Sequence, residues 1–210
     1  MPELLLTPAE ARVLAALVEK SIITPQYYPM TVNAIAQSAS QKTARKPVMR
    51  LGQGEAGAAL NALATLGLVS RDDRAGRVPK WRHHAQHQLL LPSAELALLV
   101  TLMLRGPQTV AELRGAAAAL GGPADADTVA QGLERLADRA QPLVAALPRQ
   151  PGQSALRHAH TLCGEPPAAA AEALSSTPGG GELAQRLTRL EARVAELEAR
   201  LRGCAAEPIF

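Results

Sequence analysis

The stretch LTPAE at residues 6–10 returns as LPSAE at residues 91–95, and apolar residues follow both copies at helical spacing. Three further segments recur after these in the same order. They are PMTV at 29–32 and PQTV at 107–110, LNALA at 60–64 and LERLA at 133–137, and KWRH at 80–83 and ALRH at 155–158. Four matched segments in one order predict a tandem repeat.

The local sequence of each copy predicts three helices and then a hairpin. Thr7 and Glu10 form a capping box at the start of the first helix. The third helix of the first copy is expected to bury Leu60, Leu63 and Leu66, which lie on one helical face. Three helices followed by a two-stranded hairpin form the winged-helix arrangement.

The expected fold class is mainly α with small β-hairpins: two tandem winged-helix domains, then a linker and a C-terminal coiled-coil helix. The domains are placed at residues 1–88 and 89–164. Residues 165–181 are rich in Ala, Pro, Ser and Gly, a composition typical of a flexible linker. Residues 182–204 contain the apolar seam of a heptad repeat, formed by Leu183, Leu187, Leu190, Val194, Leu197 and Leu201.

The charges beside these heptad residues favour a parallel homodimer. Arginines occupy the g positions (Arg186, Arg193 and Arg200) and glutamates occupy two e positions (Glu191 and Glu198). In a parallel pair Arg186 faces Glu191 of the partner helix, and Arg193 faces Glu198. The alternative is an amphipathic helix that packs on its own chain.

The composition argues against a membrane protein, a secreted protein and a protein that binds single-stranded nucleic acid. The 210-residue chain has no stretch near the roughly 18 apolar residues that cross a bilayer, so no membrane partner is expected. It begins without a basic leader and has two cysteines, which favours the reducing cytoplasm. Four aromatic residues are too few for a surface that stacks single-stranded bases.

Three segments resemble one bacterial family. They are TPQYYP at 24–29, QKTARKPVM at 41–49 and LMLRGPQT at 102–109. They look like the signature segments of the YceH-like proteins, and the resemblance covers roughly residues 4–164. It implies two tandem winged-helix domains and a cytosolic protein, and it implies no catalytic or binding residues.

Positive charge is concentrated at the start of the chain. Residues 1–88 contain 11 Lys and Arg against 6 Asp and Glu, whereas residues 165–210 contain 5 against 7. Two clusters are candidates for phosphate contacts. They are Lys42, Arg45, Lys46 and Arg50 before the third helix, and Arg71, Arg74, Arg77, Lys80 and Arg82 in the hairpin.

Each cluster also has a simpler interpretation. The segment from Gln41 to Gly52 can serve as a structural loop with Pro47, Val48 and Met49 packed inward, and the hairpin cations can be ordinary solvated charges. The third helix of the first copy contains no Lys or Arg, and Asn61 is its candidate for reading bases.

The sequence therefore predicts a non-enzymatic regulator that binds double-stranded DNA mainly through the first domain. The second domain is expected to serve in dimerisation or to bind another protein. The alternative is a protein-interaction adaptor that does not bind DNA. Histidines cluster at 83–87 and 158–160 without the spacing of a metal motif, and no catalytic motif is present, so no metal, cofactor or catalytic residue is expected.

Overall fold

The first helix begins with the capping box that its sequence predicts. In the computed structural model, the Thr7 hydroxyl accepts a hydrogen bond from the Glu10 N–H at 3.3 Å. The Glu10 carboxylate accepts one from the Thr7 N–H at 2.9 Å, so two of the helix's unpaired donors are satisfied. The structure describes residues 4–72, 78–149 and 155–164.

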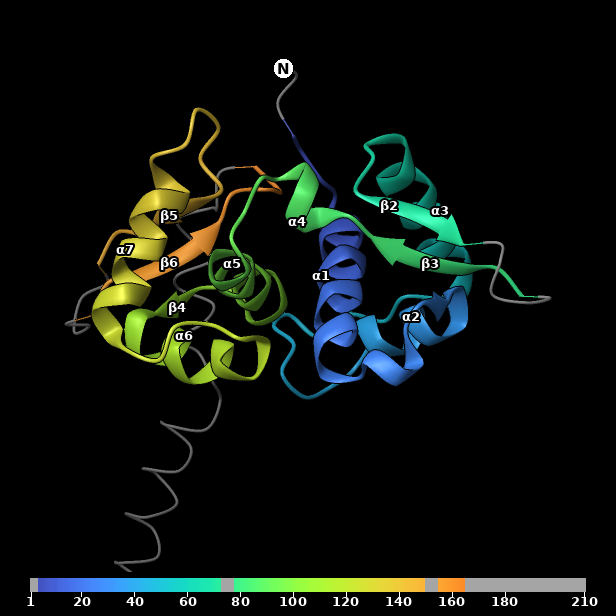
Figure 1. Ribbon diagram of the computed structural model, residues 1–210, viewed down its shortest axis with the longest axis horizontal. Helices are drawn as coiled ribbons and strands as arrows, with labels where there is room; N and C mark the ends of the chain where they lie inside the picture. The colour runs from blue at the N-terminus through green and yellow to red at the C-terminus, as the bar shows by residue number, and fades with distance from the viewer. Residues whose placement is uncertain (1–3, 73–77, 150–154, 165–210) are drawn as a thin grey trace, which may run out of the picture. The chain divides into compact units, whose positions relative to one another are not determined.

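The protein is mainly helical with small antiparallel sheets (Figure 1). Within the described residues there are seven α-helices, two short 3₁₀ helices and six short strands. In chain order they are α1 (Pro8–Ile23), η1 (Pro25–Tyr27), β1 (Met30–Thr31), α2 (Val32–Ala39), α3 (Gln53–Thr65), β2 (Val69–Asp72), β3 (Lys80–His83), α4 (Ala85–Gln88), α5 (Ser93–Arg105), β4 (Gln108–Thr109), α6 (Val110–Ala117), η3 (Ala118–Leu120), α7 (Ala126–Ala137), β5 (Val144–Ala146) and β6 (Arg157–His160).

The order of elements repeats. In the first half (residues 4–88) the strand order is β1-β3-β2, and in the second half (residues 89–164) it is β4-β6-β5. Both sheets are antiparallel, with Met30 opposite Trp81 in one and Gln108 opposite His158 in the other. Each sheet has one strand more than the predicted hairpin, because the repeated PMTV and PQTV segments supply β1 and β4.

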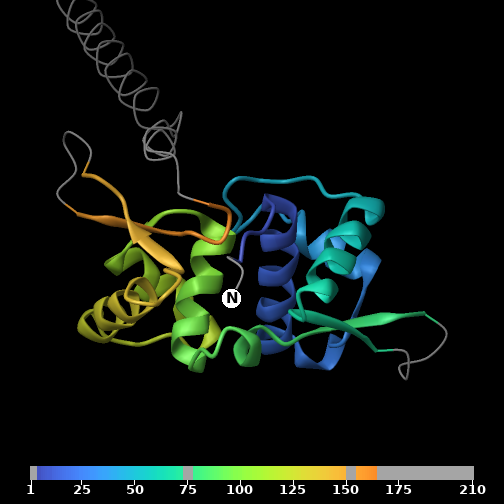
Figure 2. The same ribbon diagram turned by 90° about the horizontal axis from the view of Figure 1, so that it is seen from above.

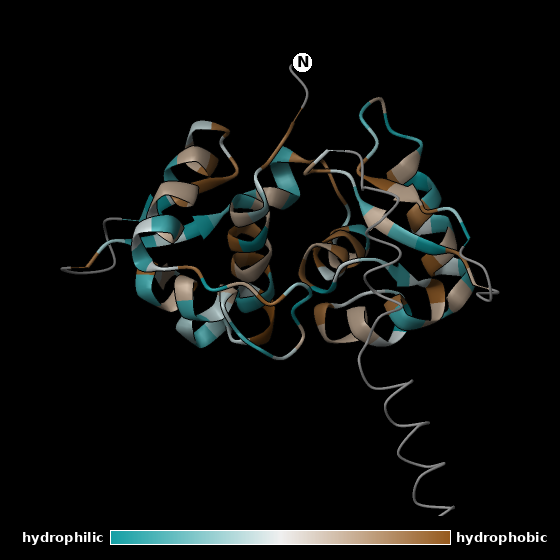
Figure 3. Ribbon diagram, turned by 180° about the vertical axis from the view of Figure 1, so that it is seen from behind, coloured by the Kyte–Doolittle hydropathy of each residue, from teal (hydrophilic) through white to brown (hydrophobic). Residues whose placement is uncertain are grey.

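One continuous hydrophobic core runs through both halves. The helices α1 and α5 lie side by side at its centre, with the two sheets on opposite sides (Figures 1 and 2). Apolar residues are concentrated on these two helices (Figure 3). Leu14, Leu17, Leu99 and Leu102, which carry the repeat signal, are at most 2% exposed. We call this contact between α1 and α5 the seam.

The prediction for α3 needs one correction. Leu60 and Leu63 are fully buried, but Leu66 is 45% exposed. Leu66 follows the last helical residue, and Gly67 then turns the chain with φ of +72°. That left-handed conformation favours glycine and ends the helix before Leu66 can pack on the inner face.

The described residues belong to one compact unit. The predicted linker at 165–181 and the coiled-coil residues from Leu183 to Leu201 lie outside the described residues, so both stay predictions. None of the helices in the described ranges is long and apolar enough to cross a membrane.

A matched pair of glycine substitutions tests the packing of α7 on α5. A Cβ atom at Gly132 in α7 would lie 2.8 Å from Leu98 Cδ1, whereas one at Gly115 in α6 would meet nothing within 4 Å. We expect Gly132→Ala to destabilise the protein by about 1 kcal/mol, because overpacking outweighs the gain in helix propensity. Gly115→Ala should stabilise it by about 0.5 kcal/mol. Urea unfolding measures both, and equal effects would contradict this packing.

Candidate functional site

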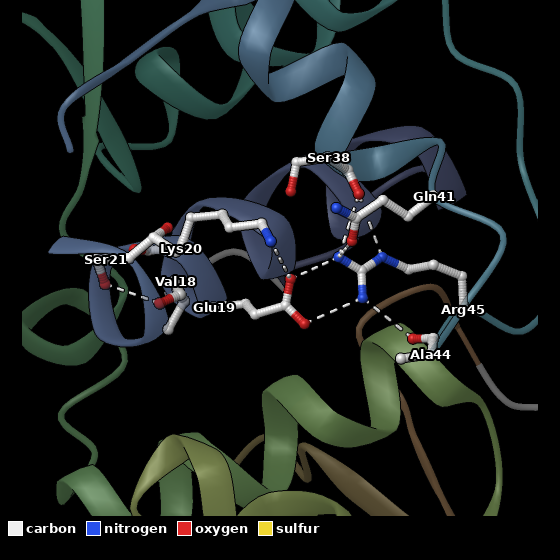
Figure 4. Close-up of polar contacts among 9 residues, drawn as sticks. Val18, Glu19, Lys20, Ser21, Ser38, Gln41, Ala44 and Arg45 are labelled. Carbon is white, nitrogen blue, oxygen red and sulfur yellow. Dashed lines mark hydrogen bonds and ion pairs between the residues drawn. The ribbon is translucent and has the colours of Figure 1, made fainter. Parts of the chain in front are cut away.

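A buried ion pair fixes the loop between α2 and α3. This bridging loop, residues 41–52, places the Arg45 side chain at 0% exposure against Glu19 of α1. Arg45 Nη1 donates to Glu19 Oε1 at 3.0 Å and Nη2 donates to Oε2 at 2.5 Å, which is a bidentate pair. Further bonds run from Arg45 to the carbonyl oxygens of Ser38 and Ala44 and to Gln41 (Figure 4).

A second buried arginine lies next to this pair. Arg12 of α1 is 2% exposed and donates to the carbonyl oxygens of Ala39 at 3.4 Å and Pro47 at 2.8 Å. Among the described residues it has no carboxylate partner. Burial, and then the nearby Arg45 charge, lower the pKa of Arg12. Arg12 and Arg45 together satisfy carbonyl groups at the C-terminus of α2, where the helix dipole favours cations.

The expectation that Arg45 contacts phosphate is corrected by this geometry. All of its guanidinium nitrogens donate to protein acceptors, and its side chain has no exposed surface. Sequence reasoning missed Glu19 and Arg12 as the partners of the loop. The available signal was that both are charged residues within the apolar pattern of α1.

The other cations of the bridging loop lie on the surface. Lys42, Lys46 and Arg50 are exposed, and none has a carboxylate partner in the described part of the chain. The structural alternative is wrong for Pro47, which is exposed, and for Val48, which is 54% exposed. Met49 is half-buried, and Leu51 at the end of the loop packs against the core. Buried arginines hold the loop while its lysines face solvent.

The hairpin of the first half offers fewer available cations. Arg82 donates to Asp72 at 2.7 Å and its guanidinium lies 5.7 Å from the centre of the Tyr28 ring. Arg71 is exposed and Lys80 is half-buried. The other two predicted positions, Arg74 and Arg77, lie outside the described residues.

The exposed face of α3 carries mostly small side chains, and its one exposed charge is Glu55 in the first turn. Asn61 is exposed on this helix together with Gly54, Ala58 and Thr65. Near the start of the helix, the Gln53 side-chain amide donates to the Asn33 side-chain oxygen of α2 at 3.0 Å. Small side chains leave room for another molecule's backbone to approach this helix.

The second half differs in its surface charge. Its third helix, α7, exposes Asp127, Glu134 and Arg135, and the exposed Asp138 follows the helix. Two of the half's arginines are paired with acids: Arg135 with Glu95 at 2.5 Å, and Arg157 with Glu112 at 2.8 Å. Among the described residues, α3 therefore exposes one acidic residue and no cation, whereas α7 exposes two acidic residues and an arginine that is already paired.

The histidines of β3 and β6 are half-buried. The Ser21 hydroxyl donates to the Val18 carbonyl at 2.7 Å, so His83 Nε2, 2.9 Å away, must be the donor in their bond. Its Nδ1 is then an acceptor with no partner in the described part of the chain, and burial lowers the pKa of His83 to about 4. The strand registers match His83 to His160, because His83 lies opposite Val69 and His160 lies opposite Val144. The predicted match of KWRH to ALRH is thus wrong by two residues. The pKa of His160 is also lowered to about 4, by burial and then by Arg12. In the described ranges no three His, Cys, Asp or Glu residues converge as metal ligands.

A family described as "Protein of unknown function, DUF480" matches residues 6–153. This chain belongs to that family. The resemblance to the YceH-like proteins is thereby confirmed. The buried Glu19–Arg45 pair and the elements from α1 to β5 lie within the matched residues, and β6 follows them.

Curated relatives extend over nearly the whole chain. A UPF0502 protein of Azoarcus sp. (strain BH72) is 47% identical over 203 residues, which cover 92% of this chain and 90% of the relative. One from Geobacter sulfurreducens is 43% identical, covering 93% and 91%. One from Stenotrophomonas maltophilia (strain R551-3) is 45% identical, covering 94% and 93%.

Removing the charge of Glu19 should destabilise the protein strongly. Glu19→Gln leaves Arg45 buried without a counter-charge, and we expect a loss of about 3 kcal/mol in the free energy of unfolding. Glu95→Gln is the matched control, because Arg135 is 55% exposed and water can solvate it. The control should lose about 1 kcal/mol or less. Equal losses in urea unfolding would mean that Arg45 is not held by the charge of Glu19.

The half-buried histidines make stability depend on pH. Because their pKa values are lower in the folded state than the usual 6.5, unfolding takes up protons below that value. Stability is complete above about pH 6.5 and falls as the pH drops toward 4. His160→Gln should remove about 2 kcal/mol of the loss between pH 7.5 and pH 5, and His87→Gln, at an exposed position, should remove none. Urea unfolding at the two pH values decides this.

Proposed function

We propose that this protein is a non-enzymatic, cytoplasmic regulator that binds double-stranded DNA, with phosphate contacts made mainly by the first half. The observation that carries the proposal is the bridging loop. Arg45 anchors the loop from within, and Lys42, Lys46 and Arg50 remain exposed without carboxylate partners in the described residues. Their charges are available to an acidic partner.

The anchoring supports phosphate binding on energetic grounds. A loop that is ordered before binding does not lose backbone freedom when the partner arrives. Besides the Arg45 pair, the Leu51 N–H donates to the Ser40 hydroxyl at 2.9 Å, which ties the end of the loop to its start. Lys and Arg on such a frame suit contacts to phosphate oxygens, which are read without regard to base sequence.

The arrangement of elements supports the same proposal. We interpret each half, with its three helices and small antiparallel sheet, as a winged helix. In this interpretation α3 takes the place of the helix that enters the major groove, and the exposed Asn61 is its candidate for base contacts. Arg71, Lys80 and Arg82 in β2 and β3 would reach the flanking backbone.

We also propose a parallel homodimer, formed by the heptad residues from Leu183 to Leu201. Two copies of a basic first half would double the number of phosphate contacts. In the second half Arg135 and Arg157 are already paired with acids, so we assign this half to dimerisation or to binding another protein.

The second candidate function is a protein-interaction adaptor. The observation that favours it is an exposed apolar group at the end of α1 and in η1, where Ile22, Ile23 and Tyr27 are 42%, 45% and 73% exposed. Apolar residues of this size on the surface are typical of protein contacts. An adaptor that binds through these apolar residues would give the cations of the bridging loop no role. For this reason we favour DNA binding.

The salt dependence of DNA binding tests the proposal. If about four cations reach phosphates, log affinity for a short fluorescent duplex should fall with log salt at a slope of about −3.6. Lys42→Ala with Lys46→Ala should reduce the magnitude of that slope by about 1.8 and weaken binding equally for unrelated sequences.

The control removes two charges elsewhere. Arg114→Ala with Arg149→Ala changes the net charge by the same amount at exposed positions of the second half, and should leave the slope unchanged. A wild-type protein that binds no duplex at low salt would overturn the proposal in favour of the adaptor.

A further inference from the structure

The bridging loop reaches across the seam to the second half. The Lys46 N–H donates to the Leu104 carbonyl of α5 at 2.8 Å, and Figure 2 shows the loop passing from α2 toward α5 before it returns to α3. Gly106, with φ of +72°, follows α5, and a Cβ atom there would lie 3.5 Å from the Lys46 carbonyl oxygen. The first and second halves are therefore in direct backbone contact at Lys46.

This contact brings a cation of the second half to the loop. Arg105 is the last residue of α5 and lies between Leu104, which accepts the hydrogen bond from Lys46, and Gly106, which leaves room for the Lys46 carbonyl. It is half-buried and has no carboxylate partner among the described residues. By contrast, Arg135 in α7 and Arg157 in β6 form ion pairs with Glu95 and Glu112.

The buried charges beneath the loop nearly cancel. Arg12 and Arg45 lie there against the single carboxylate of Glu19, which leaves an excess of one positive charge. The C-terminal carbonyls of α2 and α5, at roughly half a charge each, offset that excess. The positive charge that this surface offers therefore comes from Lys42, Lys46, Arg50 and Arg105.

We infer that the phosphate-binding surface crosses the seam, with Arg105 of the second half joining Lys42, Lys46 and Arg50 against one DNA backbone. This inference rests on the proposed function and changes its geometry. The repeat in the sequence suggests two separate binding units, each centred on its own third helix. The contacts at Lys46 instead give one surface made by both halves, so the halves bind in a single fixed orientation.

Removing the Arg105 charge tests the inference. Arg105→Gln in the full chain should reduce the magnitude of the salt slope by about 0.9, as expected for one lost phosphate contact. At about 0.1 M salt this corresponds to roughly eightfold weaker binding of a short DNA duplex. Arg105→Lys retains the charge and should keep the wild-type slope. Thermal unfolding curves of each variant check that it is folded under the conditions of the DNA-binding measurement.

The matched control is Arg149→Gln, which removes one exposed charge beyond the end of β5. It should bind as the wild type does. If Arg105→Gln binds DNA with the wild-type slope, or if both variants lose the same amount, the inference is wrong and the proposed function stands. If the wild type binds no duplex at all, the proposed function fails first.

Discussion

The rest of the site depends on the ion pair between Glu19 and Arg45. A buried arginine without an acid is strongly unfavourable, so the pair decides where the bridging loop lies. Once Arg45 is drawn inward, the loop backbone also meets Arg12 and α5. Of the four cations that the sequence places in this segment, one then serves the fold and three remain on the surface.

Much of the fold could be predicted from local patterns. The capping box at Thr7 and the leucines that repeat between α1 and α5 depend only on residues close in sequence, and they occur as expected. The strands β1 and β4 were missed because two residues are too few for a periodic pattern. Their existence depends on pairing with β3 and β6, which lie about 50 residues later.

The candidate site was harder to predict because its charges are sorted by contacts distant in sequence. Lys42 and Arg45 look alike in a basic segment, and only the position of Glu19, on another helix, separates a surface cation from a buried one. Likewise, the histidines of β3 and β6 cluster in the sequence like metal ligands. Their pKa values instead reflect burial next to Ser21 and Arg12.

The repeat itself explains why the ion pair occurs once. In the second half the position of Glu19 is taken by Leu104 and that of Arg12 by Ala97, so an apolar interior replaces the charged one. Evolution from one arrangement to the other requires more than a single substitution, since losing either Glu19 or Arg45 alone leaves a buried charge without its partner. Among diverging descendants of this chain, the two positions are therefore constrained to change together.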